Sequence, residues 1–168
     1  MTNIAVSPEV RDTLASNGAV VALESTIFSH LGLPSPANDQ ALTRCIAAIR
    51  NAGAVPAITA VIDGIARVGL NESEHERILG PAKKAGEREL ALAISQRWSV
   101  GATTVSASLF LAAQAGVGVF ATGGIGGVHR DVQVHGDISA DLGALADHPV
   151  VTVCAGAKSF LDIPRTLE

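Results

Sequence analysis

Short apolar runs rich in β-branched residues alternate along this sequence with segments of helical periodicity. The apolar runs lie at residues 19–23, 54–62, 117–121 and 150–155, and helical patterns occupy residues 36–51 and 105–115. Such alternation is typical of α/β domains, in which helices flank a largely parallel sheet. We therefore expect residues 1–168 to form one α/β domain with a mixed, largely parallel sheet, in which residues 19–23 and 150–155 are buried strands.

One pattern in the middle of the chain predicts an antiparallel pair of strands. Asp63 and Gly64 separate the apolar runs 54–62 and 65–68, and this dipeptide favours the tight turn of a β-hairpin. Before it, apolar residues recur at spacings of three and four within residues 36–51, as in an amphipathic helix. The sheet is therefore expected to carry a local hairpin beside its parallel strands.

Composition excludes several classes of protein. The 168 residues are 48% hydrophobic, which excludes disorder, and 12 basic against 16 acidic residues give a net charge of −4. This balance disfavours a nucleic-acid partner but allows a small phosphorylated ligand. The sequence shows no signal peptide and no membrane-length apolar run, and Cys45 and Cys154 are expected to be reduced thiols. We expect a cytoplasmic protein with no membrane partner.

Glu24 directly follows the first apolar run. A carboxylate at the carboxyl end of a strand lies where open α/β sheets bind ligands, and it can act as a general acid or base. The alternative is a loop acid that caps a helix or accepts hydrogen bonds. Position alone leaves both interpretations open.

A glycine-rich segment follows the run at 117–121. Residues 122–130 read TGGIGGVHR, and the glycines allow backbone N–H groups to approach a ligand closely. The spacing matches neither the dinucleotide fingerprint nor the phosphate-binding loop of nucleotide hydrolases. A tight turn and an anion site are both possible, and His129 with Arg130 favours the anion site.

Asp137 and Asp141 are four residues apart at the start of an expected helix over residues 137–146. This spacing places two carboxylates on one helix face, where they suit a hard metal ion or a hydroxyl-rich ligand. The alternative is an ordinary helix start, in which acidic residues favour the helix dipole.

Lys158 follows the apolar run VTVCAGA. Apolar surroundings can desolvate a lysine and favour the neutral amine, which attacks carbonyl carbons. The alternative is a solvated loop lysine. Lys83 and Lys84 are expected to be surface charges unless a ligand lies beside them.

Five strings in this order resemble the pseudouridine-5′-phosphate glycosidase family, also called indigoidine synthase A-like proteins. They are VALESTIFSHLGLP, GAVPAITAVIDG, VFATGGIGGVHR, DISADL and VCAGAKSFLDIPRTLE. The resemblance implies an α/β fold, a homotrimer and reversible cleavage of the carbon–carbon glycosidic bond of pseudouridine 5′-phosphate to uracil and ribose 5-phosphate.

The resemblance also implies roles for individual residues. Lys158 matches the nucleophile that forms an imine with C1 of the ring-opened sugar, and Glu24 matches the acid that shuttles a proton. His129 matches a further active-site position. Asp137 matches the ligand of a divalent metal, typically manganese.

The substrate-binding residues implied by the same resemblance lie in three segments. They are Lys84, which matches the phosphate-binding lysine, Thr104 with Val105, and Ser139, Ala140 and Asp141. The match is looser around Lys84, and Lys83 is the alternative counterpart.

Members of this family continue well beyond the string that ends at residue 168 and carry a further active-site asparagine there. The chain is therefore expected to be the amino-terminal half of the family's full domain. An active glycosidase is the leading hypothesis, and a non-catalytic fragment that binds sugar phosphate or oligomerises is the second. The third is a Schiff-base enzyme acting on sugar phosphates with no nucleobase.

Overall fold

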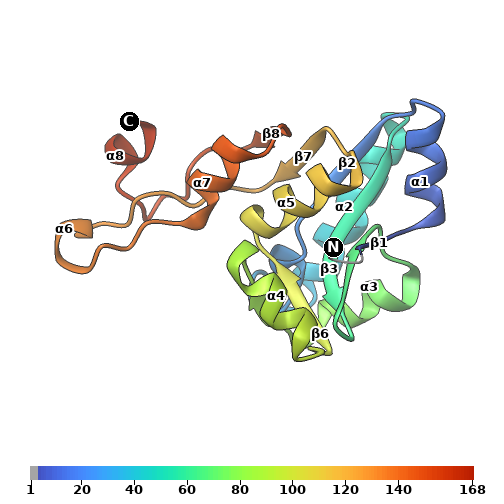
Figure 1. Cartoon of the computed structure of the whole chain (residues 1–168), viewed down its shortest axis with the longest axis horizontal. Coiled ribbons are helices and arrows are strands. Elements are labelled where there is room, and N and C mark those ends of the chain that lie inside the picture. The colour runs from blue at the N-terminus through green and yellow to red at the C-terminus, as the bar shows by residue number, and fades with distance from the viewer. Residues whose placement is uncertain (1–3) are drawn as a thin grey trace.

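The computed structural model describes residues 4–168 (Figure 1). Its strands are β1 (Ile4–Val6), β2 (Val20–Leu23), β3 (Val55–Ile62), β4 (Ile65–Val68), β5 (Lys83–Ala85), β6 (Val100–Thr103), β7 (Val119–Thr122) and β8 (Val151–Cys154). Its α-helices are α1 (Pro8–Ala15), α2 (Ala37–Asn51), α3 (Glu72–Leu79), α4 (Glu87–Ser95), α5 (Val105–Ala115), α6 (Val132–His135), α7 (Ala140–Asp147) and α8 (Ile163–Leu167), and η1 (Thr26–Phe28) is a 3₁₀ helix. No helix among these residues is both long and apolar enough to span a membrane.

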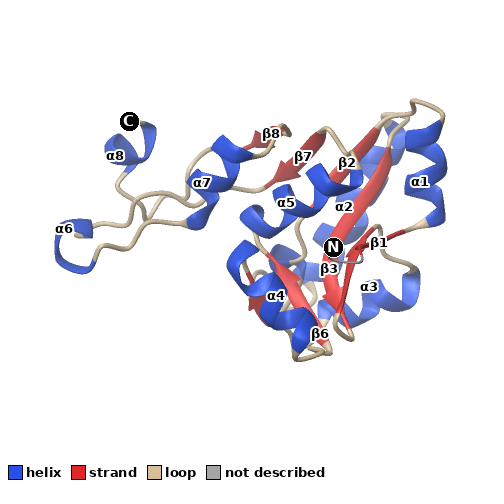
Figure 2. Cartoon of the chain, in the orientation of Figure 1, coloured by secondary structure: helices blue, strands red, loops and turns tan. Residues whose placement is uncertain are grey.

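The strands of the described residues form one mixed sheet (Figure 2). Its main order is β1-β4-β3-β2-β7-β8, with β6 beside β3 and β5 beside β6. The pairs β2–β3, β2–β7 and β7–β8 are parallel, whereas β3 and β4 are antiparallel across the turn at Asp63 and Gly64. Both turn residues have positive φ, 51° and 79°, as a tight hairpin turn requires. The predicted mixed, largely parallel sheet with a local hairpin is confirmed.

Strand β3 is buried on both faces, and its side chains alternate between two hydrophobic clusters. Ala57 and Val61 pack in the cluster that includes residues of α1, α4 and α5, whereas Ile58 and Ile62 pack in the cluster that includes residues of α2 and α3. Helices therefore cover both faces of the sheet, and a continuous apolar run suits a strand in the middle layer.

The sheet forks along β3, and the fork brings two strand ends together. Residues 55–58 pair with β2 and residues 60–62 pair with β6, so the carboxyl ends of β2 and β6 meet beside Thr59. Buried hydroxyl groups join these ends. The Thr103 hydroxyl donates to the Thr59 carbonyl at 2.7 Å, and the Thr103 N–H donates to Ser25 Oγ at 2.9 Å. Glu24 and Thr104, which adjoin Ser25 and Thr103 in the sequence, are thereby held in one region of the fold.

The carboxyl-terminal segment extends away from the other elements, with α6 and α8 at its far end (Figure 1). The expected strand over residues 150–155 forms as β8, but the expectation that it is buried is wrong. Val151 and Val153 are 65% and 58% exposed, because they share one face of β8 and the described residues leave that face uncovered. Cys45 and Cys154 are both free, half-buried thiols.

Candidate active site

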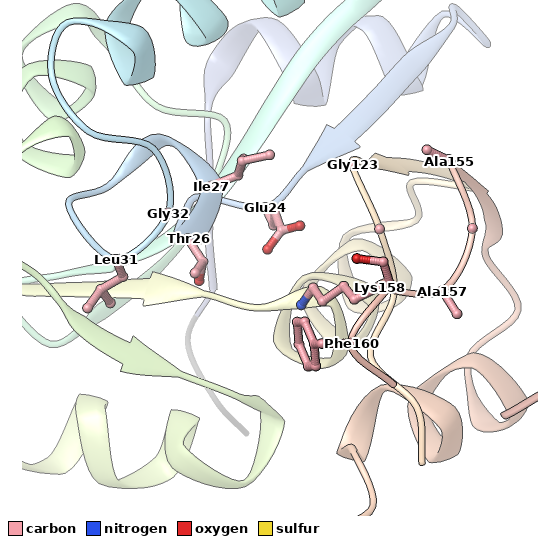
Figure 3. Close-up of a pocket in the computed structure, with 13 residues that line it drawn as sticks. Glu24, Thr26, Ile27, Leu31, Gly32, Gly123, Ala155, Ala157, Lys158 and Phe160 are labelled. Carbon is pink, nitrogen blue, oxygen red and sulfur yellow. The ribbon is translucent and has the colours of Figure 1, made fainter. Parts of the chain in front are cut away.

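Two cavities of about 540 and 780 Å³ lie between the sheet and the carboxyl-terminal segment. They share five lining residues, which are Glu24, Thr26, Leu31, Lys158 and Phe160. In Figure 3 the Glu24 carboxyl group and the Lys158 side chain reach into the same space from opposite walls. The structure therefore brings together the two residues that the sequence analysis placed at different strand ends.

Glu24 lies at the carboxyl end of β2 and is only 7% exposed. Burial raises the pKa of its carboxyl group above the ordinary value of 4.5. A hydrogen bond from the Thr122 hydroxyl and the positive charges of Lys158 and Lys84 oppose this increase, while the charge of Asp141 adds to it. A carboxyl group with a raised pKa keeps its proton to higher pH and can serve as a proton donor.

Lys158 is held by backbone contacts between the glycine-rich segment and the segment that follows β8. Its N–H donates to the carbonyl of Ile125 at 3.0 Å, and the Ile125 N–H donates to the carbonyl of Gly156 at 3.1 Å. The Lys158 residue itself is exposed. Of the two interpretations of Lys158, the solvated loop position therefore holds within residues 4–168, since Lys158 lies in the loop that follows β8.

The two adjacent lysines of β5 face opposite sides of their strand. Lys84 lines the larger cavity with Glu24 and Lys158. The Lys83 ammonium lies 4.8 Å from the centre of the Trp98 ring and lines a separate hollow. Of these two lysines, Lys84 alone lines the cavity that contains Glu24.

The glycine-rich segment is tied to α7 and to the start of α5 by Asp141. One carboxylate oxygen of Asp141 accepts the N–H of Ser106 at 3.0 Å, and the other accepts the N–H of Gly126 at 2.8 Å. A β-carbon at Gly126 would overlap Ser139 Oγ and lie 2.8 Å from Oδ2 of Asp141, so a side chain there would displace the carboxylate that accepts the Gly126 N–H. The N–H groups of Ile125 and Gly126 are thus used within the protein, although Gly123 and Gly124 border the smaller cavity.

The expected helix over residues 137–146 is wrong at its start. Helix α7 begins at Ala140, because the Ser139 hydroxyl accepts the Asp141 N–H at 3.2 Å and caps the helix. Asp137 precedes the helix, and its carboxylate lies 3.5 Å from Nδ1 of His129. Asp137 and Asp141 therefore do not share a helix face, since Asp141 turns inward to the backbone amides.

Asp137 is the residue that would hold a divalent metal in this cavity. Asp137 is exposed on the cavity wall, and residues 4–168 contain no group of three His, Cys, Asp or Glu side chains arranged to hold a metal. A manganese ion on Asp137 would need water and ligand oxygens at its other positions. Asp137 as a metal ligand stays a prediction.

The remaining residues implied by the resemblance fall into two groups. Those that line the larger cavity are Lys84, Thr104, His129, Ser139 and Ala140, along with Glu24, Asp137, Asp141 and Lys158. Val105 does not line it, because Val105 is the first residue of α5 and its side chain is buried in the hydrophobic core.

Thr122 and Phe160 are among the residues of the site that the sequence analysis missed. Thr122 donates a hydrogen bond to Glu24, and the Phe160 ring lies 5.6 Å from the His129 ring while lining both cavities. A signal for Thr122 was available, since it is the first polar residue after the apolar run at 117–121. Phe160 carried no such signal, because an exposed aromatic residue in a loop has many roles.

Comparisons with known proteins identify the family of this chain. The model of the family described as indigoidine synthase A-like protein matches residues 9–168. A pseudouridine-5′-phosphate glycosidase from Streptomyces griseus is 53% identical over 165 residues, which is 97% of this chain and 50% of the relative. One from Arabidopsis thaliana is 47% identical over 98% of this chain and 50% of its own length. The chain thus spans about half the length of these curated relatives.

Two solved structures share the fold. The prealnumycin C-glycosynthase AlnA, determined in complex with ribulose 5-phosphate, matches with a TM-score of 0.89 and 36% identity over 99% of this chain and 54% of that chain. An indigoidine synthase A-like protein from Thermotoga maritima matches with a TM-score of 0.85 and 33% identity over 99% of this chain and 53% of that chain. The family match over residues 9–168, with these relatives, shows that this chain belongs to the indigoidine synthase A-like protein family.

Proposed function

We propose that this chain supplies the nucleophile, the proton shuttle and the phosphate-binding lysine of a pseudouridine-5′-phosphate glycosidase. The observation that carries the proposal is that Glu24, Lys84 and Lys158 line one cavity although they come from three separate parts of the chain. Relatives about 50% identical that bear this name support the choice of reaction.

The reaction breaks a carbon–carbon bond between C1 of the sugar and C5 of uracil. Glu24 donates a proton to the ring oxygen as the bond from that oxygen to C1 opens, and the neutral amine of Lys158 attacks C1. The Glu24 carboxylate then takes the proton that the attached nitrogen loses and passes it to C5. The C1–C5 electron pair moves to uracil while the nitrogen lone pair forms a C=N bond. Water then hydrolyses this imine and releases ribose 5-phosphate and the free lysine. The sum is one substrate and one water giving two products, and every step can run in reverse.

Binding of the phosphate is assigned to the polar wall of the larger cavity. The Lys84 ammonium supplies charge, and the hydroxyl groups of Thr104, Ser106 and Ser139 line the same space. A phosphate monoester accepts hydrogen bonds from both kinds of donor. A divalent metal held by Asp137 would supply positive charge to ligand oxygens, and no step above passes through it.

A second candidate function is a fragment that binds sugar phosphate without cleaving the nucleobase. The exposure of Lys158 favours this alternative, because nucleophilic lysines are commonly enclosed in an apolar pocket. The exposed apolar residues of the carboxyl-terminal segment also suit a chain that works in an assembly, for which we propose the family's homotrimer.

Incubation with pseudouridine 5′-phosphate separates the two candidates. The glycosidase releases equal amounts of uracil and ribose 5-phosphate, measured by liquid chromatography, and forms pseudouridine 5′-phosphate when supplied with both products. A folded protein that binds ribose 5-phosphate and gives neither reaction supports the fragment. A generic Schiff-base enzyme would instead transform the sugar phosphate with no nucleobase present.

A further inference from the structure

Thr122 is the last residue of β7, and β7 runs parallel to β2 with Ala121 opposite Leu23. The next residues along the two strands are therefore Thr122 and Glu24, which emerge side by side at the carboxyl edge of the sheet. The Thr122 hydroxyl donates a hydrogen bond to Oε1 of Glu24. Adjacent parallel strands thus set this contact, so its geometry is determined by the sheet rather than by a loop.

A second contact engages the Thr122 oxygen. The N–H of Gly124 donates to Thr122 Oγ1 at 3.4 Å and occupies one lone pair of that oxygen. An ionised carboxylate can only accept, so the Thr122 hydroxyl is the donor when Glu24 is charged. The glycine-rich segment thereby helps to orient the Thr122 side chain.

A carboxyl group with one oxygen occupied by a donor carries its proton on the other oxygen. None of the hydrogen bonds among residues 4–168 ends on Oε2 of Glu24, and Glu24 lines both cavities. We propose that Thr122 is a positioning residue that reserves Oε1 of Glu24, so that Oε2 is the oxygen that exchanges the catalytic proton. This inference rests on the proposed function, since it concerns the proton shuttle of that reaction.

Other charges face the same carboxyl group and must be considered with Thr122. Lys158 comes from the segment after β8, Lys84 from β5 and Asp141 from α7. All three stay in place when the threonine hydroxyl is removed. A change in Glu24 titration on removal of that hydroxyl therefore reports the hydrogen bond itself, because a donor to the ionised form lowers a carboxyl pKa.

The test uses two substitutions at Thr122 and one on the next strand. Thr122→Val removes the hydroxyl at almost constant volume, and Thr122→Ser keeps it. Thr152 lies opposite Phe120 on β8, and its hydroxyl is buried with no hydrogen-bond partner in the described residues. Thr152→Val is therefore a matched control, because it removes a threonine hydroxyl from the neighbouring strand without breaking a hydrogen bond.

The readout is the titration of the Glu24 carboxyl carbon by ¹³C NMR, with its signal identified by its loss in Glu24→Gln. We expect Thr122→Val to raise the titration midpoint by about one to two pH units, the equivalent of one hydrogen bond to a charged group. Thr122→Ser and Thr152→Val are expected to keep the wild-type midpoint. Circular dichroism spectra that match the wild type establish that each variant is folded.

The pH dependence of sugar trapping on Lys158 provides the second readout. In Thr122→Val, the pH limit that Glu24 imposes on trapping of ribose 5-phosphate by borohydride is expected to move upward with the NMR midpoint. An unchanged Glu24 midpoint in folded Thr122→Val, or a midpoint in Thr122→Ser equal to that of the valine variant, would overturn the inference. Absence of any wild-type adduct would overturn the proposed function instead, while the NMR titration would still decide the role of Thr122.

Discussion

Lys83 and Lys84 are neighbours in the sequence, yet they lie on opposite faces of β5. Lys84 lines the cavity that contains Glu24 and Lys158, whereas the Lys83 ammonium lies over the Trp98 ring. Successive side chains of a β-strand point to opposite faces, and this alternation separates the two charges. The strand thereby assigns one lysine to the candidate active site and the other to the outer surface.

This arrangement predicts unequal effects of two otherwise identical substitutions. Lys84→Ala is expected to weaken binding of ribose 5-phosphate about tenfold or more, because it removes a charge-assisted contact to phosphate. Lys83→Ala is expected to change the affinity by less than about twofold, since only a surface cation–π contact is lost. Isothermal titration calorimetry of the two variants measures both values. Equal losses of affinity in the two variants would show that the opposite orientations of Lys83 and Lys84 do not determine which lysine binds phosphate.

Asp141 is expected to matter for stability because both of its carboxylate oxygens accept backbone N–H groups. In Asp141→Asn, the amide NH₂ replaces one acceptor and faces an N–H group, which we expect to cost about 2 kcal/mol in the free energy of unfolding. Asp147→Asn is the matched control, since Asp147 is exposed at the end of the same helix and is expected to change stability by less than about 0.5 kcal/mol. Urea unfolding measures both. A neutral Asp141→Asn variant would contradict the structural role of this carboxylate.

Stability is expected to depend on pH through Glu24. Burial raises the pKa of Glu24 in the folded chain above its ordinary value of 4.5, so ionisation opposes folding. The penalty is absent below that ordinary value, where both states are protonated, and it grows as the pH rises through the raised folded pKa. Glu24→Gln removes the penalty and is expected to be more stable than the wild type at about pH 8 and equal to it at about pH 4. A stability difference that does not change with pH would contradict a raised pKa for Glu24.

The outer edge of β8 is expected to cause self-association. Val151 and Val153 are exposed on a strand that has one paired edge in the described residues, and such edges pair readily with other chains. Replacing both valines by threonine is expected to reduce association, as measured by sedimentation velocity over a range of concentrations. Val134→Thr, on the exposed helix α6, is the control and is expected to have no effect. Association unchanged by the double substitution would place the interface elsewhere.

The alternation of apolar runs and helices predicted the layers of the fold, because short apolar runs between helical segments are typical of strands in an α/β sheet. The hairpin at Asp63 and Gly64 was also predictable, since few residues adopt positive φ at two successive positions. The fork of the sheet at β3 was not predictable. The fork depends on the pairing of β6 with β3. These strands are far apart in the sequence, and no local sequence pattern predicts that they pair.

Site residues that directly follow a strand could be predicted from the sequence. The orientation and exposure of a side chain could not be predicted where contacts between distant segments determine them. Glu24 and Lys158 became candidates from their positions after apolar runs, and the resemblance to the family supplied their roles. Position alone did not decide between a desolvated and a solvated Lys158, because its exposure depends on contacts with other segments. The inward orientation of Asp141 was missed for a similar reason, since its partners, Ser106 and Gly126, belong to other segments.

The central claim is that Lys158 forms an imine with a sugar phosphate beside Glu24. The most direct measurement is incubation with ribose 5-phosphate, reduction with borohydride and mapping of the adduct by mass spectrometry. We predict one reduced sugar-phosphate adduct on Lys158, lost in Lys158→Ala and retained in Lys83→Ala. Folded, soluble protein that gives no adduct, or an adduct spread over several surface lysines, would contradict the account.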